Sequence, residues 1–124
     1  MSNYPEITAE LVADPHADDC AIYDAAKGDE DAQLWLARLY LATSEAAPSQ
    51  SIRISTAIGA VAFSCLAATH GKVEAVSVYR DCLAHHRAIV EYPSEVASSQ
   101  DQLIARLNEA IEGRAGTDRV KVRV

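Results

Sequence analysis

The chain has 124 residues, a hydrophobic fraction of 49% and a formal net charge of −7 at pH 7. This length favours one folded domain with a sizeable core, and the acidic balance argues against nucleic acid and anionic membranes as partners, because both repel negative charge. No apolar run approaches the roughly 20 residues that cross a bilayer, and the N-terminus lacks the basic and apolar segments of a secretory signal. We therefore expect a cytoplasmic protein that binds neither a membrane nor nucleic acid.

The cysteines are consistent with a reducing compartment. They are three in number and lie far apart, at Cys20, Cys65 and Cys82, so they do not form the even set of a disulfide framework. We expect buried free thiols, which behave as small apolar residues. A metal-binding or catalytic role is the alternative.

The N-terminal part predicts an arm or short helix over residues 1–13, followed by a helix over about 15–27. Asp14 suits the cap of this helix, and Pro15 suits its first position, where a missing N–H costs nothing. The arm would dock on the body through Ile7, Leu11 and Val12, and the helix would bury Cys20, Ile22 or Tyr23, and Ala26.

A glycine turn then leads into the next helix, over about 30–43. Gly28 supplies the left-handed conformation that commonly ends a helix, and Asp29 suits the N-cap, since its carboxylate accepts from free backbone N–H groups. The apolar residues that follow are spaced three and four apart, which places them on one buried face: Ala32, Trp35, Leu36, Leu39 and Tyr40.

The same turn recurs at an offset of 43 residues. The pattern A-x-x-G-x-x-[DE]-A begins at Ala25, with its glycine at Gly28, and again at Ala68, with its glycine at Gly71. Small Ala residues allow two antiparallel helices to approach closely, the glycine makes the turn, and the acidic residue lies in the first turn of the next helix. The sequence therefore predicts two repeated helix pairs.

The run AAKGDEDAQLWLARLY resembles the Sel-one-like repeat, a relative of the tetratricopeptide repeat with the usual form A-x-x-G-x-x-x-A followed by L-x-x-x-Y. The matching positions are Ala25, Gly28, Ala32, Leu36 and Tyr40. The second copy is degenerate: Tyr79 replaces the Leu, Leu83 replaces the Tyr, and both copies lack the usual Gly after the second helix. The resemblance covers about residues 17–90 and implies an α-helical scaffold that binds proteins.

Two further helices form the second pair. The helix over about 50–69 carries Gly59 in its interior, at a cost of about 1 kcal/mol relative to Ala. A neighbouring helix that crosses closely at that point would explain the glycine, and a kink at a binding site is the alternative. The apolar residues of this helix form a stripe: Ile54, Ile58, Val61, Ala62, Cys65, Leu66 and Thr69. The helix over about 72–91, which ends before Pro93, would bury Val76, Tyr79, Leu83, His86 and Val90.

A last helix begins at Ser94 or Ser99, where Ser99 and Gln102 have capping-box spacing, and ends at Gly113. Residues 114–124 carry four basic residues and one acidic residue, and Val alternates with charged residues in the period of a strand. Three readings of this tail stay open: a frayed segment, a tail folded onto the acidic helices of its own chain, and a strand that adds to a partner or to a second copy.

These elements predict an all-α fold, in which antiparallel helix pairs stack as a short α-solenoid or a compact bundle of about five helices, with a basic C-terminal tail. We expect one helical domain over 1–113. It would contain repeat-like units at about 17–44 and 50–90 and a flanking helix at 94–112, and the tail over 114–124 would be flexible or strand-forming.

The sequence offers little candidate chemistry. Cys82, His85 and His86 have the spacing of two metal ligands on one helix, but the remaining ligands would have to come from other helices. The acidic residues around the first glycine turn have no predicted pocket, so we interpret them as a solvated face. No phosphate-binding loop and no G-x-S-x-G or H-E-x-x-H pattern occurs. We therefore expect no metal, cofactor or catalytic residue, and an enzyme only through residues scattered in sequence.

A protein–protein interaction module, such as a small cytoplasmic adaptor or inhibitor, is the function that we expect. A self-associating component of a homo-oligomer, such as a homodimer, is the alternative, because two repeats leave apolar ends that a second copy would cover. The residues expected to contact a partner are Tyr40, Tyr79, Arg80, His85, Arg87, Arg119, Lys121 and Arg123.

Overall fold

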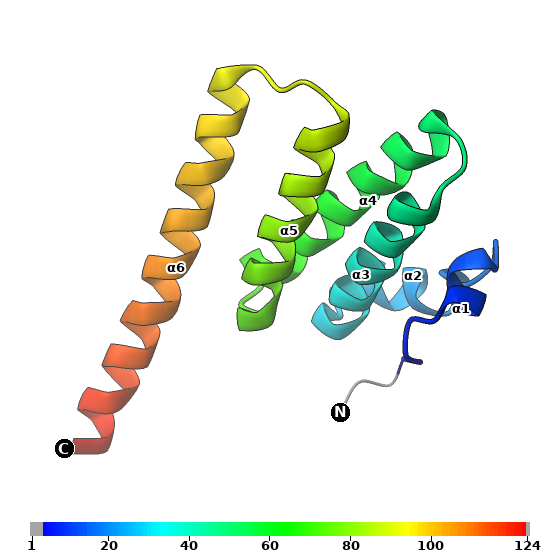
Figure 1. Ribbon diagram of the computed structural model, residues 1–124. Helices are drawn as coiled ribbons and strands as arrows, with labels where there is room; N and C mark the ends of the chain where they lie inside the picture. The colour runs from blue at the N-terminus through cyan, green and yellow to red at the C-terminus, as the bar shows by residue number, and fades with distance from the viewer. Residues whose placement is uncertain (1–3, 124) are drawn as a thin grey trace. The chain divides into compact units, whose positions relative to one another are not determined.

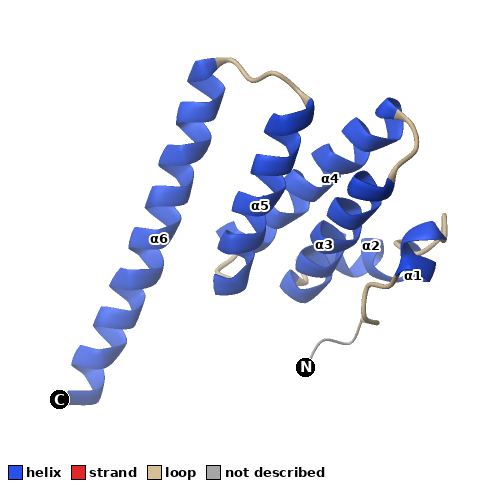
Figure 2. Ribbon diagram, viewed as in Figure 1, coloured by secondary structure: helices blue, strands red, loops and turns tan. Residues whose placement is uncertain are grey.

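A computed structural model describes residues 4–123, except that the side chains of residue 111 and of residues 113–123 lie outside the description. Six helices follow one another: α1 Ala9–Ala13, α2 Asp19–Ala26, α3 Glu30–Ala46, α4 Gln50–Thr69, α5 Val73–Ile89 and α6 Ser94–Arg123 (Figures 1 and 2). No strand occurs among the described residues. The prediction of an all-α fold of packed helix pairs is confirmed.

The chain divides into two units, residues 1–91 and 92–124. The first unit holds α1 to α5, and α3 is its central helix, because α3 contacts each of the other four (Figure 1). The second unit consists of α6 and the residues that lead into it. The boundary thus lies at residue 92, whereas the sequence predicted one domain over 1–113.

Two tight turns with the same geometry close the helix pairs α2–α3 and α4–α5. Gly28 has φ of 101° and Gly71 has φ of 100°, both in the left-handed region that favours glycine. In each turn the glycine N–H donates to the carbonyl three residues earlier (3.1 Å), and the next N–H donates to the carbonyl five residues earlier (3.0 Å). This is the bonding pattern of a Schellman cap, and it turns the chain back on itself in both places.

Side chains connect the two turns to each other. Gln33, which is 1% exposed, donates through Nε2 to the Ala25 carbonyl (3.0 Å). Its Oε1 lies 3.2 Å from His70 Nδ1. Lys72 Nζ donates to Asp31 Oδ1 at 2.6 Å. These contacts hold the two helix pairs side by side at their turn ends.

Helix α3 begins as predicted. The Asp29 carboxylate accepts from the backbone N–H of Asp31 (2.9 Å) and of Ala32 (3.2 Å), which satisfies two of the free donors at the helix start. The predicted apolar face is also confirmed, since its members are buried or half-buried: Ala32, Trp35, Leu36, Leu39 and Tyr40. The helix continues to Ala46, three residues beyond the predicted end.

Helices α2 and α4 bury faces that the sequence analysis did not predict. In α4 the buried residues are small: Ala57, Ala60, Ser64, Ala67 and Ala68. Ile58 and Leu66 of the predicted stripe are instead 52% and 42% exposed. Likewise α2 buries Ala21 and Ala25, while Ile22, Tyr23, Cys20 and Ala26 are exposed.

The physical reason is the close approach of these helices to their neighbours. Ser64 is fully buried and donates to its own helix, at the Ala60 carbonyl (2.7 Å), so it occupies little more space than an alanine. Because Ala and Ser side chains are short, a face made of them lets the axes of two helices approach closely. The atoms of the two helices then pack densely against each other. Large side chains on the same face would hold the helices apart.

The start of α2 also differs from the prediction. Asp14 is the C-cap of α1, and its carboxylate accepts from the His16 backbone N–H (2.9 Å). Residues 15–18 form a turn, and α2 begins at Asp19. The Asp-Pro pair therefore starts a turn that an Asx hydrogen bond stabilises, which is the competing use of these residue types.

The N-terminal arm docks on the body, as predicted. The Tyr4 ring stacks on Trp35 with centroids 5.3 Å apart, and its hydroxyl donates to Asp24 Oδ2 (2.8 Å). Trp35 Nε1 donates to the Pro5 carbonyl (2.8 Å). The predicted docking residues Ile7, Leu11 and Val12 pack on the same core cluster.

Helix α5 buries Val76, Tyr79 and Leu83 of the predicted face, while His86 and Val90 are only half-buried. It also buries Ala75, Val78 and Cys82. Helix α6 begins at Ser94, so the spacing of Ser99 and Gln102 does not cap it, and it continues past Gly113 to Arg123. The backbone of residues 114–123 is thus helical and does not form the predicted strand. Gly113 and Gly116 each cost a helix about 1 kcal/mol, and no proline follows Pro93 to stop it.

Helix α4 is long and apolar enough to cross a membrane by length and composition, although no such run was expected from the sequence. The core helix of a globular protein can have the same length and composition. Here α4 packs against both α3 and α5. Its small polar residues, among them Ser55 and Thr56, hydrogen-bond within the helix.

Candidate functional site

Helix α4 exposes an apolar face. Among its 20 residues only Arg53 is charged. Ile58, Ala62 and Leu66 are exposed and follow one another at intervals of four residues, so they lie on one side of the helix. We refer to these three residues as the α4 surface.

A groove lies beside this face, between α1, α3 and α4. It consists of three adjoining cavities of about 520, 210 and 300 Å³. Val12, Ala13 and Thr43 line both the first and the second cavity, and Tyr40 and Thr56 line both the second and the third. The three cavities therefore adjoin one another, and we call them together the groove.

The groove adjoins the α4 surface and is itself mainly apolar. Ser55 lines its third cavity and lies one turn before Ile58 on the exposed side of the helix. The threonine hydroxyls in the groove are occupied by their own helices, because Thr43 donates to Leu39 (2.8 Å) and Thr56 donates to Ile52 (2.6 Å). The walls thus offer few free hydrogen-bonding groups to a ligand.

Tyr40 shapes the middle of the groove. Its hydroxyl donates to Asp18 Oδ2 (2.7 Å), and its ring lies against Phe63 with centroids 5.8 Å apart. A Cβ at Gly59 would approach Tyr40 Cδ2 to 3.1 Å, so a neighbouring helix does cross closely at this glycine, as predicted. Burial, followed by the hydrogen bond to Asp18, raises the pKa of Tyr40 above its ordinary value, so this hydroxyl is protonated at neutral pH.

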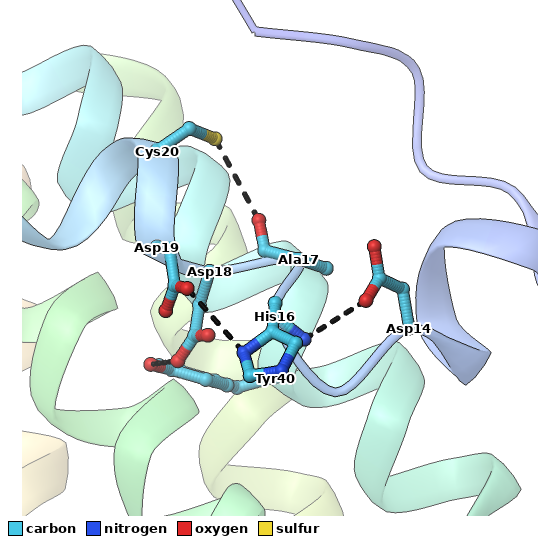
Figure 3. Close-up of polar contacts among 7 residues, drawn as sticks. All are labelled: Asp14, His16, Ala17, Asp18, Asp19, Cys20 and Tyr40. Carbon is cyan, nitrogen blue, oxygen red and sulfur yellow. Dashed lines mark hydrogen bonds and ion pairs between the residues drawn. The ribbon is translucent and has the colours of Figure 1, made fainter.

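Carboxylates lie beside the middle of the groove. Asp14 and Asp18 line the second cavity, and Asp19 follows Asp18 at the start of α2 (Figure 3). His16 lies among them, with Nδ1 3.5 Å from Asp19 Oδ2. We call Asp14, Asp18 and Asp19 the acidic edge.

A second polar cluster joins α3, α4 and α5 at the other end of the helices. Ser44 Oγ donates to the Arg53 carbonyl (2.6 Å) and lies 2.7 Å from His85 Nε2. A serine has one hydroxyl hydrogen, so Ser44 accepts from His85, whose Nε2 must carry the proton. Ser44 is fully buried and its hydrogen is already used, so this pair holds three helices together and is not arranged as a nucleophile and its base.

The residues weighed as metal ligands do not converge. Among the residues that the structure describes, no three His, Cys, Asp or Glu side chains are grouped to hold a metal ion. Cys82 is buried, and burial raises the pKa of its thiol to about 11. Burial also lowers the pKa of His86, with a further contribution from His85. Of the other thiols, Cys20 is exposed rather than buried and Cys65 is half-buried.

The predicted partner-binding residues fall in different places. Tyr40 lines the groove. Tyr79 was wrongly assigned to a surface, because it lies in the core with 3% exposure. Arg80 is exposed on α5, whereas His85 is half-buried against Ser44.

The remaining predicted positions do not add to this site. Arg87 is half-buried on α5, which does not line the groove. Arg119, Lys121 and Arg123 belong to α6, and their side chains lie outside the described residues.

Sequence reasoning missed the groove and the α4 surface. One signal for them was present, since 19 of the 20 residues of α4 are uncharged in a chain of which 23% is charged. No protein-family model, curated protein or solved structure matches this chain.

Proposed function

We propose that this chain is a non-enzymatic protein–protein interaction module, a small cytoplasmic adaptor or inhibitor, and that it binds its partner through the groove and the α4 surface. The observation that supports this is the exposure of Ile58 and Leu66 on a helix whose small residues are buried. Large apolar side chains on a solvent-facing side, beside an apolar depression, are typical of surfaces that another protein covers.

The energetics favour such a role. Fully burying an Ile or Leu side chain contributes roughly 1.5–3 kcal/mol, and the folded chain leaves Ile58 52% exposed and Leu66 42% exposed. A partner that covers both side chains gains part of this free energy without any change in the fold. The exposed α4 surface next to the groove suits a helical segment of the partner, which presents its own apolar residues at intervals of three and four.

Self-association is the second candidate. The α4 surface carries no charge, so two copies of it could meet without the repulsion that a net charge of −7 otherwise causes between copies. This proposal shares the surface with the first one and differs in the identity of the partner.

A capture experiment with matched variants tests both candidates. The tagged chain is exposed to lysate of the source organism as the native sequence, as the Ile58→Asn/Leu66→Asn variant, and as a Val73→Asn control, since Val73 is 58% exposed on α5. We expect a protein retained by the native chain and by the control but lost from the double variant, and the purified protein should then bind the double variant at least tenfold more weakly. Equal retention by all three chains would contradict the assignment of the surface.

Sedimentation velocity over a dilution series separates the two candidates. A monomer at all concentrations favours a different protein as partner. A dimer that the double variant abolishes and the Val73→Asn control retains favours self-association.

A further inference from the structure

The charges around the groove are distributed unevenly. Asp14 and Asp18 of the acidic edge line the second, middle cavity, and Asp19 lies next to them at the start of α2. Arg53 does not line the groove, and its Nη2 donates to the carbonyl of Ala47, a residue of the first cavity (3.1 Å). The groove therefore combines apolar walls with negative charge beside its middle cavity.

The acidic edge has no strong cation of its own among the described contacts. Asp18 accepts from the Tyr40 hydroxyl, Asp14 accepts from the His16 backbone, and Asp19 is paired with the His16 side chain. These partners are a neutral hydroxyl, a backbone amide and an imidazole. Residues 1–31 contain nine acidic residues and one lysine, Lys27, whose Nζ lies over the Tyr23 ring (4.3 Å to its centroid).

We propose that the segment that binds in the groove belongs to a protein partner and is an amphipathic helix whose apolar stripe is flanked by Lys or Arg, with the basic residues at the acidic edge. This inference rests on the proposed function and names the chemistry of its partner. The apolar walls supply the binding free energy, and the carboxylates select against acidic segments, because like charges brought together there repel.

The size of this selection is modest, because the carboxylates are exposed. Asp14 is exposed and the Asp19 side chain is 70% exposed, so water and salt screen both charges. Exposed ion pairs change affinity by small factors each, and two of them acting together give about a tenfold preference for a basic over an acidic segment at low salt. The preference should shrink as the salt concentration rises.

Three synthetic peptides test this proposal on the full chain. Each has about four helical turns and the same Leu and Ala stripe, and the polar positions are Lys, Glu or Gln. Binding is measured by the fluorescence anisotropy of a labelled peptide at neutral pH, at low and at high salt. We expect the Lys peptide to bind about tenfold more tightly than the Glu peptide at low salt, with the Gln peptide between them.

Two charge-neutralised variants locate the effect. Asp14→Asn/Asp19→Asn keeps the shape of the acidic edge and removes two charges. It should bring the ratio of the affinities for the Lys and Glu peptides close to one. Glu74→Gln/Asp81→Asn removes two exposed carboxylates from α5, which does not line the groove, and should leave the preference unchanged. Circular dichroism of each variant confirms that it is folded.

The outcomes separate this inference from the proposed function. If all three peptides bind equally and Ile58→Asn/Leu66→Asn weakens them all, the interaction surface stands and the preference for a basic partner is refuted. A preference that both neutralised variants lose equally reflects the net charge of the chain and also refutes the inference. If no peptide binds, both the inference and the assignment of the groove are overturned.

Discussion

Two adjacent residues of α4 give the sharpest test of the structure. Ala57 is fully buried between α4 and its neighbours, whereas Ile58 is 52% exposed. Adjacent positions are about 100° apart around a helix. An aspartate at position 57 would therefore enter the buried interface, whereas one at position 58 would lie at the exposed face. We expect Ala57→Asp to be severely destabilising and Ile58→Asp to be mild.

The magnitudes follow from the two environments. A carboxylate at position 57 would be buried without a partner, which costs about 3–5 kcal/mol, a large share of the roughly 5–15 kcal/mol that stabilise a typical domain. At position 58 about half of the apolar contribution of Ile is lost, or about 1 kcal/mol. For a unit of this size, each kcal/mol lowers Tm by about 4–8 °C, so the two variants should differ by about 10 °C or more.

Urea unfolding followed by fluorescence measures this difference. Trp35 is the single tryptophan and is 6% exposed in the core, so its emission reports on unfolding of the first unit. Ala57→Asn is the control for volume, because its side chain has nearly the size of aspartate without the charge. If Ile58→Asp cost as much as Ala57→Asp, the large apolar residues of α4 would face the core and the α4 surface would not exist.

Three further predictions concern individual contacts. Gly59→Ala should leave the free energy of unfolding nearly unchanged, because the close contact of the new Cβ with Tyr40 (3.1 Å) offsets a helix gain of about 1 kcal/mol. In a Tyr40→Phe background the ring loses the hydrogen bond that anchors it. There the same change should stabilise the protein by about 0.5–1 kcal/mol in urea unfolding. Ser44→Ala should cost about 1–3 kcal/mol by the same assay, because it leaves His85 and a carbonyl without their buried partner, and a smaller loss would contradict the buried network. Burial lowers the pKa of His86 below 6.5, so the unfolded chain takes up this proton first as the pH falls. The unfolding free energy should therefore decrease from about pH 7 to about pH 5.5, and His86→Gln should flatten that part of the profile; an unchanged profile would refute the role of this histidine.

Much of the helical architecture was predictable because its signals are local. Gly28 and Gly71 set the two turns, and Asp29 caps α3, through groups that lie within a few residues of one another. The bounds of α4 were also predicted closely, and in the structure a cap at Ser49 and the glycine turn at Gly71 enclose the helix.

The candidate site was not predictable, because it depends on contacts between distant residues. Tyr40 lies against Gly59 and bonds to Asp18, and these residues come from three different segments. The groove exists where α1, α3 and α4 meet, so no single helix contains its pattern. Tyr79 was misassigned for a related reason: its spacing on α5 fits a core position, and its aromatic hydroxyl also suits a binding surface.

The sequence by itself determined the helical class, the two glycine turns and the Asp29 cap of α3, because backbone hydrogen bonding and left-handed glycine are decided within one helical turn. Only the tertiary structure decided which face of α2 and α4 is buried. Hydrophobic periodicity favoured the large residues of α4, but the distance between two helices is set by the side chains of both. Because α3 approaches closely, the alanines and Ser64 are buried, and Ile58 and Leu66 remain on the outside.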